Sequence, residues 1–146
     1  MTSTTFHIPD DRYYDSANHL WVRVDSTTGR VVIGIDTLGL QALGDLVYIT
    51  LKDVGTPVKR GEAVGTFEAA KMTGDLIAPV SGILIGCNEK VLRDPLLVNR
   101  DPYDNGWIVS FDPTDWKKES TALISGDAIP AWVAAEVERY RMQGWI

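Results

Sequence analysis

The chain has 146 residues, of which 45% are hydrophobic and 23% charged, and its formal net charge is −6 with a pI near 4.8. This length suits one domain with its own hydrophobic core, and the acidic balance disfavours binding to nucleic acid or to an anionic membrane surface. With the single cysteine Cys87 an intrachain disulfide is excluded. Neither a signal peptide nor an apolar run long enough to span a bilayer is recognisable, so we expect a cytoplasmic protein. We also expect a monomer.

Short strands separated by turns follow an irregular N-terminal arm. Apolar and polar residues alternate over 20–24, and a turn ending at Gly29 leads into a second strand, which predicts a hairpin. Asp36 or Thr37 can cap a short helix that runs to Leu43 and stops at Gly44. Strands this short, with turns this regular, are typical of a sandwich or flattened barrel. The predicted strands cover residues 20–24, 30–35, 46–51, 63–68, 76–80, 83–87 and 106–111, with single helical turns over 88–92 and 94–98.

The end of the chain has a different, helical pattern. Asp127 can cap a helix whose first turn contains Pro130, and apolar residues recur at helical spacing as far as Tyr140. Gly144 follows as a stop. We expect the aromatic side chains of this segment, Trp132, Tyr140 and Trp145, to pack in the core. The predicted organisation is an arm over 1–12, a main domain over 13–125 and an amphipathic C-terminal helix within 126–146 that packs on it.

One lysine lies between two short apolar runs, in the segment Glu68-Ala69-Ala70-Lys71-Met72. Gly74 and Asp75 follow, and these residue types close tight turns because glycine tolerates positive φ and aspartate bonds its own backbone. We therefore predict that Lys71 stands exposed at a hairpin tip. A lysine with a pKa of about 10.4 is a poor nucleophile unless it is desolvated, and a wet hairpin tip does not desolvate it. The position suits a lysine that another enzyme acylates.

The segment around Lys71, together with Ala78-Pro79-Val80-Ser81-Gly82, resembles the attachment site of lipoyl and biotinyl carrier domains. Two more blocks, His19-Leu20-Trp21-Val22 and the stretch from Leu97 to Trp107, extend the resemblance over roughly residues 9 to 113. Over this length the chain is similar to the glycine cleavage H-protein family. The resemblance implies a mainly β, flattened sandwich of the lipoyl/biotinyl type (a barrel-sandwich hybrid). It also implies a non-enzymatic carrier with lipoate in amide linkage to Lys71.

Leu20 departs from this family, whose first block usually has a glutamate near the loaded, amine-bearing arm. A looser resemblance, in Tyr13, Tyr14, His19 and the ending Gly144-Trp145, connects the chain to lipoate-binding proteins of heterodisulfide-reductase-like sulfur oxidation. Because leucine cannot pair with an amine, we slightly favour a carrier for sulfur oxidation over a glycine cleavage carrier of an aminomethyl group. A biotin carrier, suggested by Met72, and an unmodified binding module stay as alternatives.

Three residues besides Lys71 are implied as cofactor-binding. Asp75 matches an acidic position of the family four residues after the lysine, and Asp75 and His19 are candidates for lining a groove that shelters the cargo. Glu68 is a candidate for guiding the ligase. Each also has a purely structural interpretation: Asp75 as a turn residue, His19 as a ring bonded to nearby backbone and Glu68 as a solvated strand charge.

The resemblance also implies partners. These are a lipoate ligase, dihydrolipoamide dehydrogenase and either a sulfur-oxidising heterodisulfide-reductase-like complex or the glycine cleavage enzymes. With two histidines and one cysteine, no zinc or haem site is indicated. Cys87 is interpreted as a small buried hydrophobe rather than a redox partner of the lipoyl thiols.

Overall fold

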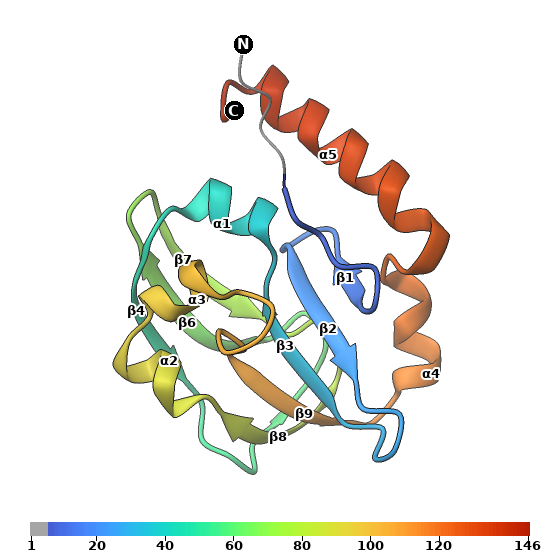
Figure 1. Ribbon diagram of the computed structural model, residues 1–146. Coiled ribbons are helices and arrows are strands. Elements are labelled where there is room, and N and C mark those ends of the chain that lie inside the picture. Colours follow the sequence, from blue (N-terminus) through green and yellow to red (C-terminus); the bar gives the residue numbers. More distant parts are fainter. Residues whose placement is uncertain (1–5) are drawn as a thin grey trace.

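Two antiparallel sheets enclose the core in the computed structural model, which describes residues 6–146 (Figure 1). Residues 1–5 of the predicted arm lie outside the described residues. The sheets do not close into a barrel, and the predicted mainly β sandwich is confirmed. The larger sheet has the order β1 (Tyr13–Asp15), β2 (Leu20–Val24), β3 (Val31–Ile35), β9 (Val109–Pro113), β8 (Gly82–Cys87) and β5 (Pro57–Val58); the smaller has β4 (Leu46–Leu51), β6 (Ala63–Ala69) and β7 (Thr73–Ile77).

The core forms because alternate side chains of each strand point inward. Val22 and Phe111 of the larger sheet and Ile49 and Phe67 of the smaller one belong to the same buried cluster. Burying each such side chain contributes roughly 1.5–3 kcal/mol. Trp21 points to the opposite face of β2 and belongs to a second, smaller cluster. The larger sheet is thus apolar on both faces at β2, which gives the C-terminal segment a surface to pack against.

The first helix, α1 (Thr37–Leu43), begins and ends as predicted. The carboxylate of Asp36 accepts a hydrogen bond from the backbone N–H of Gly39 at 2.8 Å, and Gly44 ends the helix with a φ of 76°. Four more α-helices follow: α2 (Glu89–Arg93), α3 (Leu96–Arg100), α4 (Trp116–Glu119) and α5 (Ile129–Met142). Within residues 6–146, none of the helices combines the length and apolar character that crossing a membrane requires.

Helix α5 lies against β1 and β2, on the outer side of the larger sheet (Figure 1). Its first turn contains Pro130, as predicted. Asp127 does not cap the helix, because Gly126–Ala128 forms a 3₁₀ turn and Ala128 occupies the cap position without a side-chain hydrogen bond. Helix α5 therefore depends on contacts with the sheet rather than on a cap for its position.

Several predicted boundaries are wrong. Strands β1 and β5 are missing from the prediction, and β9 begins at Val109 rather than Gly106. Gly106 is instead buried beside α3, where a Cβ would lie 2.5 Å from the carbonyl oxygen of Asp101. The strand predicted to follow Lys71 is shifted as well, which bears directly on the lysine hairpin.

Candidate functional site

Lys71 is exposed at the tip of the β6–β7 hairpin, whose turn consists of Ala70, Lys71 and Met72. The turn closes with a hydrogen bond from the N–H of Ala69 to the carbonyl of Met72 at 2.9 Å. The predicted turn at Gly74 and Asp75 is wrong, because β7 already starts at Thr73. Gly74 is needed for a different reason: a Cβ there would lie 3.0 Å from the ring of Phe67, on the paired strand.

The end of α1 braces this tip. The N–H of Lys71 donates to the carbonyl of Leu43 at 3.0 Å, and the N–H of Ala70 donates to that of Asp45 at 2.9 Å. Gly44 lies between these contacts, and a Cβ on it would approach Cβ of Ala70 at 3.2 Å and Cγ of Lys71 at 3.3 Å. The backbone of the lysine is therefore fixed while its side chain reaches solvent. Nζ donates to the carbonyl of Gln41 at 2.9 Å, and no ion pair of Lys71 is found within residues 6–146.

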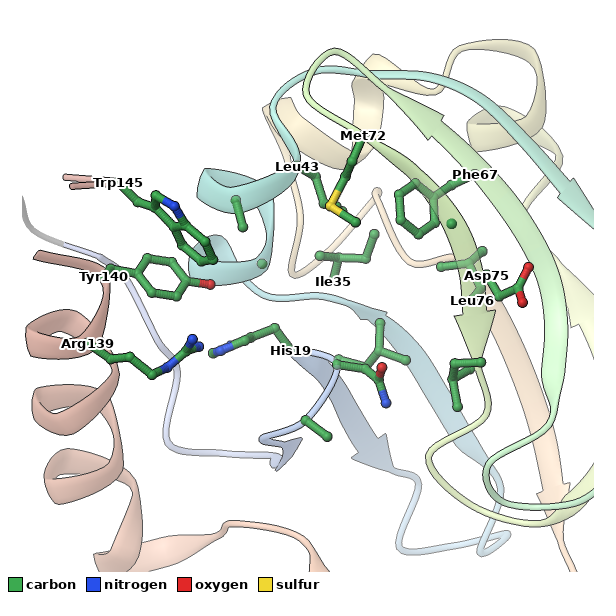
Figure 2. Close-up of a pocket in the computed structure, with 17 residues that line it drawn as sticks. His19, Ile35, Leu43, Phe67, Met72, Asp75, Leu76, Arg139, Tyr140 and Trp145 are labelled. Atoms are coloured by element: carbon green, nitrogen blue, oxygen red, sulfur yellow. The ribbon is translucent and has the colours of Figure 1, made fainter. Parts of the chain in front are cut away.

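A groove with a volume of about 360 Å³ opens beside the tip (Figure 2). Ligand pockets typically have volumes of about 300–1,000 Å³. Figure 2 shows Arg139, Tyr140 and Trp145 on one side, Phe67 and Leu76 on the other, and Met72 above. The lining residues are Ala17, Asn18, His19, Leu20, Ile35, Gly39, Ala42, Leu43, Phe67, Met72, Gly74, Asp75, Leu76, Ile77, Arg139, Tyr140 and Trp145.

The groove brings together two of the four predicted site residues, His19 and Asp75. Asp75 belongs to the rim, and its carboxylate points away from the groove interior (Figure 2). Glu68 is exposed but does not line the groove, because it follows the inward-pointing Phe67 on β6 and faces the other way. The interior is mainly apolar, with Leu20 nearly buried within it.

His19 is buried at the far end of the groove, where it joins two carboxylates. Its Nδ1 lies 3.0 Å from Oδ2 of Asp36, and its Nε2 lies 2.9 Å from Oε1 of Glu136 on α5. The ring of Trp132 stacks on it, with the centroids 5.4 Å apart. The expected bond from the ring to nearby backbone is therefore wrong. His19 also has a φ of 54°, a left-handed conformation that a non-glycine residue seldom adopts.

The pKa of His19 depends on its burial and on these two carboxylates. Burial disfavours the imidazolium, but the hydrogen bonds and charges of Asp36 and then Glu136 outweigh it and raise the pKa of His19 above its ordinary value. Burial also raises the pKa of Asp36, against the opposing effect of His19. The pKa of Glu136 is lowered: burial would raise it, but Arg139 and His19 stabilise the carboxylate more. The imidazolium can thus donate to both carboxylates at once.

Sequence reasoning did not identify the far wall of the groove. Tyr140 is buried as predicted, and its hydroxyl donates to the carbonyl of Leu38 at 2.9 Å. The predicted core position of Trp145 is wrong, because this residue is 44% exposed and faces the groove. Arg139 lies over the rings of both residues. The only sequence signal for this wall is the helical spacing that ends at Tyr140.

Cys87 lies at the end of β8, half-buried against the core and outside the groove lining. Burial raises the pKa of its thiol, with smaller contributions from Glu89 and Asp53. A thiol with a raised pKa is less reactive, so the structural interpretation of Cys87 is favoured. Within residues 6–146, no cluster of histidine, cysteine and carboxylate side chains has the arrangement of a metal site.

Comparison with known proteins places this geometry in a family. The family profile described as "Glycine cleavage H-protein" matches residues 12–136. A glycine cleavage system H protein of Anaeromyxobacter sp. (strain K) is 40% identical over 126 residues, which cover 86% of this chain and 95% of that protein. Glycine cleavage system H protein 3 of Aquifex aeolicus is 41% identical over 123 residues, which cover 82% of this chain and 76% of that one.

A solved structure agrees with the sequence comparisons. The crystal structure of a glycine cleavage system H protein from Mycobacterium marinum superposes with a TM-score of 0.68 at 40% identity, covering 73% of this chain and 87% of that one. Because the profile and the relatives extend over most of the chain, the similarity is not confined to the lysine hairpin. The chain belongs to the glycine cleavage H-protein family.

Proposed function

We propose that this chain is the lipoyl carrier of a glycine cleavage system and that Nζ of Lys71 is its attachment point. Proteins of the family carry lipoate covalently on a lysine and are carriers rather than catalysts. The observation that supports Lys71 is its position: an exposed amine on a braced hairpin tip, directly beside a groove of about 360 Å³. An amine presented in this way is accessible to a ligase, while the rest of the hairpin is held by α1.

The residues around Lys71 fit a lipoyl group. Acylation removes the positive charge of the amine but leaves one N–H, which can still donate to the carbonyl of Gln41. The groove offers an apolar interior for the hydrocarbon part of the arm, with Met72 and Leu43 next to the attachment point. When bound, lipoate supplies a dithiol that carries reaction intermediates between enzymes. The chain itself raises the effective concentration of that group at successive active sites.

The proposed partners follow from the same assignment. They are a lipoate ligase, the other glycine cleavage enzymes and dihydrolipoamide dehydrogenase. Glu68 is exposed three residues before Lys71, so we propose that it contributes to recognition by the ligase. Asp75 is proposed to act at the groove rim, where an acidic side chain attracts a cationic cargo.

Mass spectrometry after expression beside a lipoate ligase tests the function. A lipoyl amide adds about 188 Da and a biotinyl amide about 226 Da. The expected result is the smaller increase, located on the peptide that contains Lys71, together with support of glycine turnover by glycine decarboxylase. A protein that acquires neither group beside its ligase contradicts the proposal and favours an unmodified binding module.

Sulfur oxidation, the slightly favoured prediction from the sequence, is the second candidate. The relatives reported above fit glycine cleavage better, because identity near 40% over most of the chain outweighs one departing position. One observation still favours it: Leu20 lines the groove, and the carboxylate of Asp75, the acidic residue among the described lining residues, lies at the rim and points away from the interior. Lipoylated protein that does not support glycine decarboxylase would favour this second candidate.

A further inference from the structure

The groove has a wall that the family match does not include. The matched region ends at residue 136, whereas Arg139, Tyr140 and Trp145 line the groove from beyond that point. The two sides of the groove therefore have different origins. One side is formed by residues of the hairpin, such as Phe67 and Leu76, and the other by the last residues of the chain.

Specific contacts hold this wall in place. The hydroxyl of Tyr140 donates to the carbonyl of Leu38, and the N–H of Trp145 donates to the carbonyl of Tyr140 at 2.9 Å. The rings of Tyr140 and Trp145 meet edge to face, with centroids 5.0 Å apart. The side-chain amide of Gln41 donates to the carbonyl of Trp145 at 3.0 Å. Trp145 is thus fixed at its backbone on both sides, yet 44% of it is exposed toward the groove and solvent.

Gln41 also connects this wall to the attachment lysine. Its backbone carbonyl accepts from Nζ of Lys71, and its side chain donates to Trp145. One glutamine residue and two hydrogen bonds, of 2.9 and 3.0 Å, therefore separate Nζ from the backbone carbonyl of Trp145. A lipoyl group on Nζ extends the lysine side chain by a five-carbon chain and the dithiolane ring, a length comparable with this separation. The N–H retained after acylation can keep its bond to Gln41, next to the residue that holds Trp145.

We propose that Trp145 is the docking surface for the sulfur-bearing end of a lipoyl arm on Lys71, and that the C-terminal wall makes this chain shelter its cargo more closely than the matched family region alone does. The proposal rests on the proposed function. Its chemistry is the favourable contact between a polarisable sulfur and an aromatic ring. Met72, which is 49% exposed above the groove in Figure 2, supplies a second polarisable apolar contact next to the proposed attachment point.

The test compares lipoylated wild-type protein with Trp145→Ala, Trp145→Phe and Met142→Ala. Met142 is the matched control, because it is an 80% exposed residue of the same tail that does not line the groove. After reduction, the rate at which iodoacetamide alkylates the lipoyl thiols is measured on the peptide that contains Lys71, which separates it from alkylation of Cys87. We expect Trp145→Ala to react roughly two- to tenfold faster, with Trp145→Phe between it and wild type and Met142→Ala unchanged.

A second measurement does not depend on the variants. In wild-type protein, the indole N–H resonance of Trp145 should shift on lipoylation, and should shift less when octanoate, which lacks sulfur, is attached instead. Equal alkylation rates for Trp145→Ala and wild type, or an unmoved Trp145 resonance, would overturn the docking proposal. Failure of the proposed function has different signatures: Lys71 would not acquire the lipoyl mass at all, or the lipoylated protein would not support glycine decarboxylase.

Discussion

The Nε2 atom of His19 lies 2.9 Å from Oε1 of Glu136, although 117 positions separate the two residues in the sequence. This contact fastens α5 to the beginning of β2, and it lies at the end of the groove that is remote from the hairpin. On the other side of the ring, Asp36 both accepts from Nδ1 and caps α1, the helix that braces Lys71. One imidazole therefore connects the C-terminal wall with the helix that supports the proposed attachment site.

Replacing His19 should change how stability depends on pH. The pKa of His19 is raised in the folded state, so protonated His19 stabilises the fold. This stabilisation is fully present below the pKa of the unfolded chain, about 6.5, and is lost as the pH rises through the raised pKa. Because His19 loses one proton, it changes the free energy of unfolding by at most about 1.4 kcal/mol per pH unit. Glu136, whose pKa is lowered from 4.5, titrates below this window, whereas burial raises the pKa of Asp36 above its ordinary 3.8, so Asp36 adds a pH dependence of the same sign.

Urea unfolding at pH values from about 6 to about 9 measures this dependence. His19→Asn is the suitable variant, because asparagine tolerates the positive φ at this position but does not titrate. Its free energy of unfolding should be lower than that of wild type at pH 6 and should fall less steeply as the pH rises. His7→Asn, which changes the exposed second histidine, should keep the wild-type slope. If His19→Asn kept the wild-type dependence of stability on pH, the imidazolium would be excluded as the origin of that dependence.

Lys71→Arg should abolish lipoylation without affecting the fold. Arginine keeps the charge and can still donate to the carbonyl of Gln41, but a ligase cannot form the required amide on a guanidinium. Because the side chain is exposed, the free energy of unfolding should stay within about 0.5 kcal/mol of wild type. Intact-mass measurement and urea unfolding check the two statements. Lys59→Arg, at an exposed lysine outside the hairpin, should be lipoylated normally; a lipoyl mass on Lys71→Arg would place the attachment elsewhere.

Gly44 offers a way to disturb the lysine tip from outside it. Alanine there costs roughly 1–3 kcal/mol, because φ of 76° with ψ of −159° lies in a region that glycine almost alone adopts, and its Cβ would also press on Ala70 and on Cγ of Lys71. Gly29→Ala is a close control, because Gly29 has a φ of 73° and a Cβ added there would meet nothing within 4 Å. Both variants should lose stability in urea unfolding, Gly44→Ala more than Gly29→Ala, but only Gly44→Ala should slow lipoylation at Lys71. Equal lipoylation rates would show that the tip does not depend on α1.

The parts of the fold that local sequence patterns determine are predictable. Examples are the hairpin of β2 and β3, the cap at Asp36 and the end of α1 at Gly44. Each depends on residues that lie close together in the sequence. The predicted turn of the lysine hairpin is misplaced for a physical reason: Gly74 has the residue type of a turn but is required by the ring of Phe67 across the strand pair. A glycine needed for space and a glycine needed for positive φ are indistinguishable in a single sequence.

The candidate site is predictable only near the lysine. The motif identifies Lys71, and the family resemblance points to Asp75 and His19 as groove residues, which they are. The partners of His19 are not predictable, because no local pattern relates residues 36 and 136 to residue 19. The prediction for Trp145 fails for a similar reason: an aromatic residue near a helix end is buried or exposed according to what the tertiary structure places beside it.

Glu136→Gln should loosen α5 and lower the pKa of His19. Glutamine can still accept a hydrogen bond from Nε2, but it removes one of the two charges that raise the pKa and the ion pair with Arg139. Weakening this partly buried contact should cost about 1–3 kcal/mol, seen as faster hydrogen exchange in α5. Glu138→Gln breaks the exposed pair with Arg141 at the same i,i+3 spacing and should cost less than about 0.5 kcal/mol. NMR titration of His19 completes the comparison, and an unchanged titration in Glu136→Gln would mean that Asp36 alone sets the charge of the imidazole.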